Sequence, residues 1–176
     1  QAYYDTMNSI QQATLNLFAA GLFHLLEQQL TEVCHDGAFD EAPPKESRLE
    51  VVASWYCKHF GLHFSALASW PKVNQLRLLA NAIKHGEGSS ARELRILRPD
   101  LFQDPAIRKL MPDLVAMLPP LQLRLPLAGE GIFVTKEVFA EFANNTDRFI
   151  TEIAQYFLKN RDTHYPVSSY SPDRFK

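Results

Sequence analysis

Apolar residues recur at steps of three and four along several long stretches of the chain, and this is the spacing of one helical face. The first stretch runs from about Tyr3 to Val33 without a proline, and Gly37 supplies a stop just beyond it. Its apolar positions are Met7, Ile10, Leu17, Phe18, Leu22, Leu25, Leu26, Leu30 and Val33. The pattern predicts one long helix that packs these positions against a core.

Two more helices follow in the first half of the chain. Ser47 opens the first of them, because Glu50 three positions later completes a capping-box pattern, and the apolar spacing ends near Gly61. The next covers roughly Val73 to His85, and the glycines that follow His85 end it.

The second half is divided by prolines before it becomes helical again. Ser90 with Glu93 makes another capping box and opens a short helix. The stretch after it cannot hold one continuous helix, because six prolines interrupt it: Pro99, Pro105, Pro112, Pro119, Pro120 and Pro126. Thr135 is placed to cap a last helix that runs to about Asn160.

A short β-prone region precedes that last helix. Leu121, Leu123 and Leu125 alternate with polar residues, and the run Ile132-Phe133-Val134 follows two glycines, so a small β-hairpin is expected. The predicted fold is therefore mainly α, a bundle of about four main helices with a small β-hairpin insert before the last helix. Residues 1–162 are expected to form a single domain and residues 163–176 an extended or mobile tail.

Composition fits one ordinary globular domain. Of the 176 residues, 46% are hydrophobic and 22% are charged, close to the globular average. The formal net charge of -2 means that any contact with nucleic acid must use a local patch. No run of 18 apolar residues occurs, so we expect no membrane span. The two cysteines, Cys34 and Cys57, are expected to be reduced thiols in the cytoplasm.

One polar stripe stands out on the helix that ends at His85. Arg77, Asn81 and His85 are four residues apart, so they share one side of that helix, opposite its leucines. Arg77 and His85 are about 12 Å apart along the axis, because each residue rises about 1.5 Å. Lys84 lies beside the stripe. At the C-terminus of the helix, the helix dipole favours the protonated form of His85.

The segment Asn81–Gly86 resembles the motif of the HEPN superfamily of helical bundles, in which an Arg is followed after four to six residues by a His. In many members the motif reads Arg-Asn, three residues, His, often with Gly next. The Asn, His and Gly parts match here. Ala80 stands where those members have Arg, and Arg77, the nearest substitute, has seven residues between it and His85.

The resemblance implies metal-independent RNA cleavage at a homodimer interface, as in toxin or antiviral-defence effectors. His85 would then be a base or phosphate ligand, Asn81 would orient it, and Arg77 would supply positive charge to the phosphate. Because Ala80 replaces the motif Arg, a form that binds RNA without cleaving it is a second interpretation. A third is a non-catalytic helical interaction module, a subunit of a larger assembly, whose polar stripe is only the solvated face.

Lys84, Arg92 and Arg95 are the candidate RNA-binding residues beside the stripe, and a solvated helix face is the alternative for the two arginines. No metal site is predicted. The Cys and His residues lack zinc-site spacing; they are Cys34, His35, Cys57, His59 and His63. No cofactor is predicted either, since no glycine-rich phosphate loop occurs. His24, inside the first helix, is expected to be a hydrogen-bonded core or groove histidine.

Overall fold

The computed structural model describes residues 2–35, 42–111, 113, 121–123 and 131–160. This part of the chain is mainly helical, which confirms the predicted fold class. Its α-helices are α1 (Ala2–His35), α2 (Leu49–Phe60), α3 (Trp70–His85), α4 (Ser89–Leu97), α5 (Pro105–Leu110) and α7 (Lys136–Lys159). Two short 3-10 helices, η1 (Phe64–Ala66) and η2 (Pro99–Phe102), join them.

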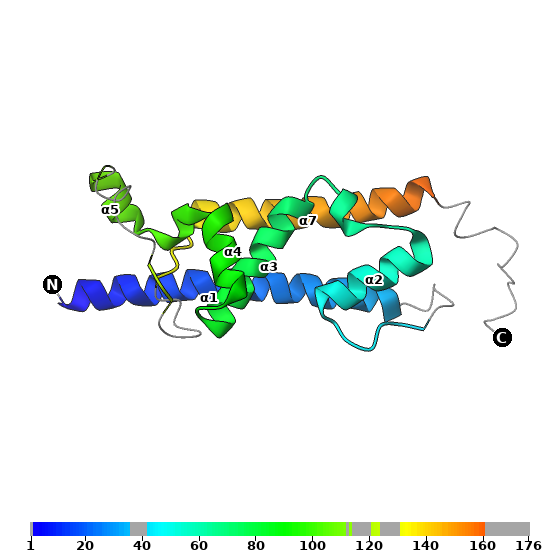
Figure 1. Cartoon of the computed structure of the whole chain (residues 1–176), viewed down its shortest axis with the longest axis horizontal. Helices are drawn as coiled ribbons and strands as arrows, with labels where there is room; N and C mark the ends of the chain where they lie inside the picture. The colour runs from blue at the N-terminus through cyan, green and yellow to red at the C-terminus, as the bar shows by residue number, and fades with distance from the viewer. Residues whose placement is uncertain (1, 36–41, 112, 114–120, 124–130, 161–176) are drawn as a thin grey trace, which may run out of the picture.

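Helix α3 is the centre of the arrangement. Helices α1 and α7 both run along the long axis of the molecule, and α3 crosses between them (Figure 1). α3 packs against α1, α4 and α7, and α2 packs against α1. The end of α3 that carries His85 therefore lies close to α1.

Only one side of α1 enters the core, and it agrees with the predicted side only in part: Leu26 and Leu30 are buried, and Leu22 packs against the core. The buried positions, again three or four residues apart, are Asn16, Ala19, Phe23, Leu26, Leu30 and Cys34. Six of the apolar residues expected to face inward are exposed instead: Met7, Ile10, Leu17, Phe18, Leu25 and Val33. α1 is apolar on two sides, and only one of them can face α3 and α7.

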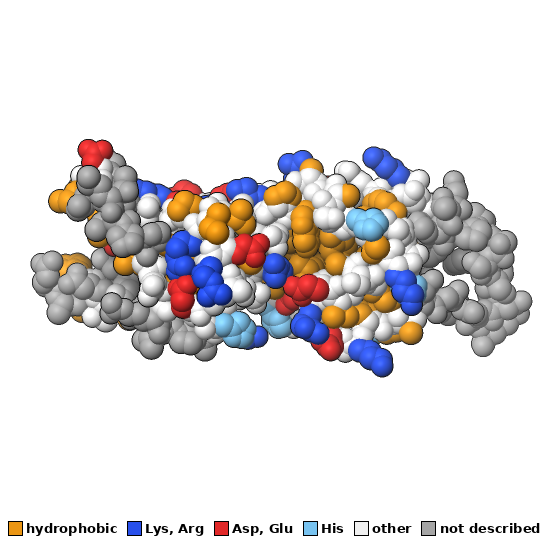
Figure 2. Space-filling view, in the orientation of Figure 1, with side chains coloured by type: hydrophobic (Ala, Val, Ile, Leu, Met, Phe, Trp, Pro, Cys, Tyr) orange, Lys and Arg blue, Asp and Glu red, His pale blue; other side chains and the backbone are white. Residues whose placement is uncertain are grey.

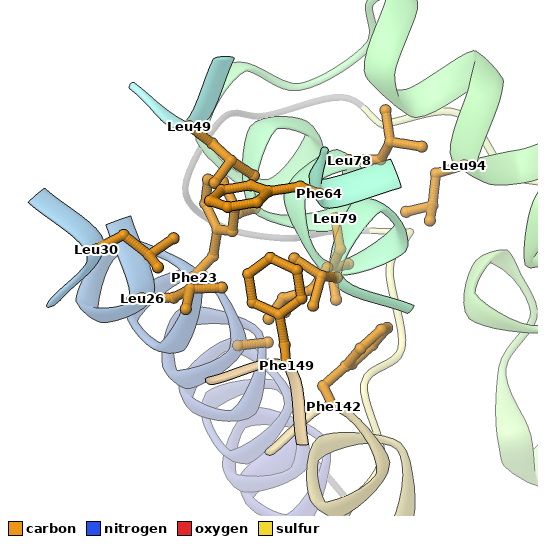
Figure 3. Close-up of a cluster of buried hydrophobic side chains, with 14 of the residues drawn as sticks. Phe23, Leu26, Leu30, Leu49, Phe64, Leu78, Leu79, Leu94, Phe142 and Phe149 are labelled. Atoms are coloured by element: carbon orange, nitrogen blue, oxygen red, sulfur yellow. The ribbon is translucent and has the colours of Figure 1, made fainter. Parts of the chain in front are cut away.

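Side chains of α1, α2, α3 and α7 together build the core. Figure 3 shows Phe23, Leu26 and Leu30 of α1 meeting leucines of α3 and Phe142 and Phe149 of α7. Burying a side chain of this size contributes about 1.5–3 kcal/mol, so this contact between helices is the main source of stability.

The predicted β-hairpin is not seen. Residues 121–123 and 131–134 form no strand, and residues 124–130, which would hold the turn, lie outside the described residues. Ile132 and Val134 are fully buried and Phe133 is half-buried, so the alternation expected of a strand is present. The backbone of this segment bonds to the Leu101 carbonyl and to side chains of α1, which replace a partner strand.

The helix caps differ in origin from one helix to the next. The Thr135 hydroxyl accepts a hydrogen bond from the Val138 amide at 3.3 Å, which confirms the predicted cap of α7. The capping box at Ser47 does not form, because α2 begins at Leu49 and its amide donates to Glu27 of α1. α4 begins at Ser89, without a side-chain cap from Ser90.

The predicted tail, residues 163–176, lies outside the described residues, and so the division at residue 162 stays a prediction. Within the described ranges, none of the helices combines the length and the apolar character needed to cross a bilayer.

Candidate functional site

The predicted stripe on α3 lines a cleft of about 700 Å³. Arg77, Asn81, Lys84 and His85 all contribute to its wall. Ala80 and Ile83 of α3 line it as well. The facing wall comes from α1, from the residue before α2 and from the start of α2: Leu17, Ala20, Gly21, Phe23, His24, Glu27, Arg48 and Glu50. The three residues expected to act together thus face one space.

The position of α3 in the core explains why the stripe remains accessible. Leu76 and Leu79 are fully buried, while Arg77 and Asn81 are half-buried and His85 is exposed. The helix therefore tilts its leucines into the core and leaves its polar side at the edge. A solute can reach His85 from solvent, while the side chain of Arg77 is held closer to the protein.

Ala80 lies in the same cleft, at 6% exposure. It directly precedes Asn81, which lines the cleft as well. The small side chain also leaves room there, because a methyl group fills little of the space between α3 and α1.

Arg77 is held by two neighbours. Its Nη1 lies 3.2 Å from Glu50 Oε1, and its Nε donates to Asn74 Oδ1 at 3.0 Å. The Arg77 side chain is 22% exposed and that of Glu50 is 65% exposed. An ion pair with one partner this exposed is weak, so an anion that enters the cleft can compete with Glu50 for the guanidinium.

The fixed charges of the cleft are mixed, with an excess of cations. Arg48, Arg77 and Lys84 face Glu27 and Glu50, and two imidazoles add positive charge when protonated. Figure 2 shows histidine, basic and acidic side chains gathered along the lower edge of the molecule, over α1 and the segment before α2. Arg48 is itself paired with Glu46 at 2.6 Å.

Glu27 links α1 to α2 beneath the cleft. One carboxylate oxygen accepts the Leu49 amide at 3.0 Å, and the other lies 3.8 Å from His24 Nδ1. Burial raises the pKa of Glu27, although the hydrogen bond from Leu49 and the charge of His24 act in the opposite direction. Because Glu27 caps the N-terminus of α2, its main role is to fix the wall that carries Glu50.

His24 is the residue that the sequence did not connect with the site. Its side chain is 64% exposed and lies across the cleft from α3, with Gln28 Nε2 3.3 Å from its Nε2. It is a groove histidine, one of the two environments expected for it. No sequence motif joins His24 to His85, because they come from different helices and meet only through the packing of α1 on α3.

Arg95 does not line the cleft, and its guanidinium is already paired. Its guanidinium makes two bonds to Glu87, at 3.0 and 2.7 Å, donates to the Leu121 carbonyl and lies over the Phe102 ring. The hydrogen bond from Arg95 lowers the pKa of Glu87. Arg92 is exposed. Of the two arginines predicted to bind RNA, Arg92 is the one that presents its charge to solvent.

Within the described part of the chain, no group of three or more His, Cys, Asp or Glu side chains is arranged to hold a metal ion. Cys57 Sγ lies 3.5 Å from His63 Nδ1, and His59, two residues after Cys57, packs against the Trp55 ring at a tilted angle instead. His35 is exposed at the end of α1, and Cys34 is buried.

Comparison with models of protein families, with curated proteins and with solved structures finds no match to this chain.

Proposed function

We propose that this chain is a HEPN-like domain that cleaves or binds RNA, with α1, α2, α3 and α7 as the four main helices of its bundle. The observation that carries the proposal is that Arg77, Asn81 and His85 line one solvent-reachable cleft together with a second histidine, His24. If the polar side of α3 were only a solvated face, no side chains of α1 and α2 would be needed opposite it.

Two imidazoles in one cleft suit the cleavage of a ribose–phosphate chain. A base removes the proton of the 2′-hydroxyl, whose oxygen attacks the phosphorus, and an acid protonates the 5′-oxygen as the P–O bond breaks. His85 and His24 supply a base and an acid without a metal ion. We assign the role of the base to His85 and the role of the acid to His24.

The cations of the cleft suit the phosphate. Negative charge develops on the phosphate oxygens during the attack, and a guanidinium can meet two of these oxygens at once. Arg77 provides that group when its pair with Glu50 opens, and Asn81, one turn further along α3, offers an amide beside it. Lys84 in the cleft wall and Arg92 outside the cleft are both exposed and would contact the backbone of RNA.

RNA binding without cleavage is the second candidate function, and Ala80 is the observation that favours it. The cleft has one cation fewer than the full motif would give, at the residue next to Asn81. Loss of one charged group that stabilises a transition state typically reduces a rate by about 10²–10³.

In the setting that the motif resemblance implies, the protein acts in the cytoplasm as a toxin or antiviral-defence effector, as a homodimer or as a subunit of a complex. A helical interaction module with no chemistry is the contrasting proposal, in which the cleft accepts a partner's side chains and RNA is not a ligand.

The test is an incubation of the purified chain with total RNA in EDTA, compared with His85→Ala. His63→Ala is the matched control, because His63 is exposed and does not line the cleft. We expect cleavage that survives EDTA, persists in His63→Ala and falls at least about 10²-fold in His85→Ala.

A filter-binding measurement on the same proteins separates the two RNA functions. Binding without cleavage, weakened by Lys84→Glu but not by Lys159→Glu on α7, would favour the binding domain. If RNA is neither cut nor bound, the RNA proposal fails and the interaction module is the better account.

A further inference from the structure

The side of α1 that faces away from the core carries a long apolar stripe. Its members, all exposed, are Tyr3, Met7, Ile10, Thr14, Leu17, Phe18, Gly21 and Leu25, and we call them the α1 stripe. Apart from the adjacent Leu17 and Phe18, successive members are three or four residues apart, which is the spacing of a helix that packs along another helix. Figure 1 shows the first turns of α1 extending past the start of α7.

Most of the α1 stripe lies in a segment of α1 without charged residues, and only its end near Leu17 and Gly21 borders the charged cleft. From Thr6 to Phe23 the chain has no Asp, Glu, Lys, Arg or His. A charged surface repels a copy of itself, whereas a neutral apolar one does not. Large exposed apolar patches on a soluble protein mark an interaction site, so the α1 stripe has the character of an interface that tolerates an identical partner.

The order of large and small residues suits an antiparallel pair. When two copies of α1 cross symmetrically at Thr14, Met7 of each lies opposite Gly21 of the other. A Cβ added at Gly21 would meet no atom within 4 Å, so there is open space for the methionine. Ile10 then faces Phe18, and Tyr3 faces Leu25.

A parallel pair fits less well. It places each residue opposite its own copy, so that Gly21 faces Gly21 and leaves a gap, while Met7 meets Met7. Interfaces that alternate large and small residues pack more densely than those that do not. We propose that a second copy of this chain docks antiparallel on the α1 stripe, with Thr14 at the two-fold axis and Met7 against Gly21.

The size of the stripe predicts a reversible dimer. Tyr3 and Leu25 are about 33 Å apart along the helix, and a helix is about 10 Å wide, which gives a footprint of about 330 Å². Stable complexes usually bury about 800 Å² on each partner. We therefore expect association that depends on protein concentration.

Two residues of the α1 stripe, Leu17 and Gly21, also line the cleft described above. In the proposed dimer, Met7 of the second copy covers Gly21 and so forms part of the rim of the cleft. Dimerisation through the α1 stripe does not depend on RNA and is measured in its absence.

Sedimentation velocity of the full chain over about a hundredfold range of concentration is the first test. We expect a shift from monomer to dimer, weakened at least about tenfold by Met7→Arg, which places a charge in the interface. Ala154→Arg on the exposed side of α7 is the matched control and should dimerise normally. Circular dichroism spectra establish that both variants fold.

Disulfide formation tests the register in a Cys57→Ser background. A mixture of Met7→Cys and Gly21→Cys chains should cross-link between the two variants, and Met7→Cys alone should cross-link far less. Equal cross-linking of Met7→Cys alone would overturn the antiparallel pairing. A wild type that stays monomeric, or a Met7-dependent binding to phosphatidylcholine vesicles by that monomer, would overturn the second copy as the occupant.

Discussion

Asn16 and Val134 lie 118 residues apart in the sequence and are joined by a buried hydrogen bond, in which the Val134 amide donates to Asn16 Oδ1 at 3.2 Å. Asn16 Nδ2 in turn donates to the Ile132 carbonyl at 2.9 Å. One fully buried side chain therefore supplies both the donor and the acceptor that a neighbouring strand would have provided. This pairing fixes the start of α7 against the middle of α1.

Asn16→Ala is expected to destabilise the fold by about 1–3 kcal/mol, because it leaves a buried amide and a buried carbonyl without their partner. Urea unfolding followed by circular dichroism measures the change. Asn144→Ala, on the exposed side of α7, is the matched control and should change the free energy of unfolding by less than about 0.5 kcal/mol. Equal effects of the two variants would show that the Asn16 bonds contribute nothing.

The contact of Asn16 with the segment before α7 is a part of the fold that could not be predicted from the sequence. α1, α3 and α7 could be predicted because each has a long apolar period free of interior prolines. The segment Ile132–Val134 has the alternation of a strand, but its partner is a side chain on a distant helix, which no local pattern encodes. The capping box at Ser47 failed for a similar reason, since the cap of α2 comes from Glu27.

One wall of the candidate site could be predicted from the sequence, and the other could not. Spacing along one helix placed Arg77, Asn81 and His85 on one side of α3, and that prediction needs no tertiary information. The opposite wall, with His24 and Arg48, depends on how α1 and α2 pack on α3. The inward side of α1 was predicted only in part, because both of its sides are apolar and only packing decides between them.

The Glu87–Arg95 pair predicts an acid-sensitive contact at the segment before α7. Hydrogen bonding from Arg95 holds the pKa of Glu87 below its ordinary value, so the pair stabilises the fold above about pH 4.5 and this stabilisation is lost as the pH falls through the lowered pKa. Because Glu87 is partly exposed, Glu87→Gln should cost only about 1 kcal/mol at neutral pH and flatten the loss of stability in acid. Urea unfolding at several pH values measures both. An unchanged acid slope would contradict the assignment.

The two thiols should differ in reactivity. Cys34 is 2% exposed, its Sγ donates to the Leu30 carbonyl, and burial raises its pKa to about 11. Cys57 is half-buried beside His63. We expect Ellman's reagent to label one thiol quickly in the native protein and both in denaturant, and Cys57→Ser to abolish the fast phase. Fast labelling that survives Cys57→Ser would contradict the burial of Cys34.

The raised pKa of Cys34 also predicts a loss of stability in alkali. The folded thiol keeps its proton to about pH 11, while an unfolded thiol ionises near 9.0, so the free energy of unfolding should fall as the pH rises between these values. Cys34→Ala removes this dependence, at the cost of a small cavity. Thermal unfolding at pH 8 to 11 measures the slope, and a slope unchanged in Cys34→Ala would assign it to another group.

Ala80→Arg offers the sharpest test of the proposed chemistry, because it adds the group that distinguishes this cleft from the HEPN motif. Ala80 is buried but lines the cleft, so a long side chain at this position can extend along the wall and place its guanidinium beside Asn81 and His85. A second guanidinium at the phosphate is expected to raise the rate of metal-independent RNA cleavage by about 10²-fold or more. Ala140→Arg, on the exposed side of α7, adds the same charge outside the cleft and should leave the rate unchanged. His85→Ala in the Ala80→Arg background should abolish the gain, since the added arginine can act only together with the imidazole. A folded Ala80→Arg protein that binds RNA more tightly yet cuts it no faster would assign the cleft to binding rather than catalysis.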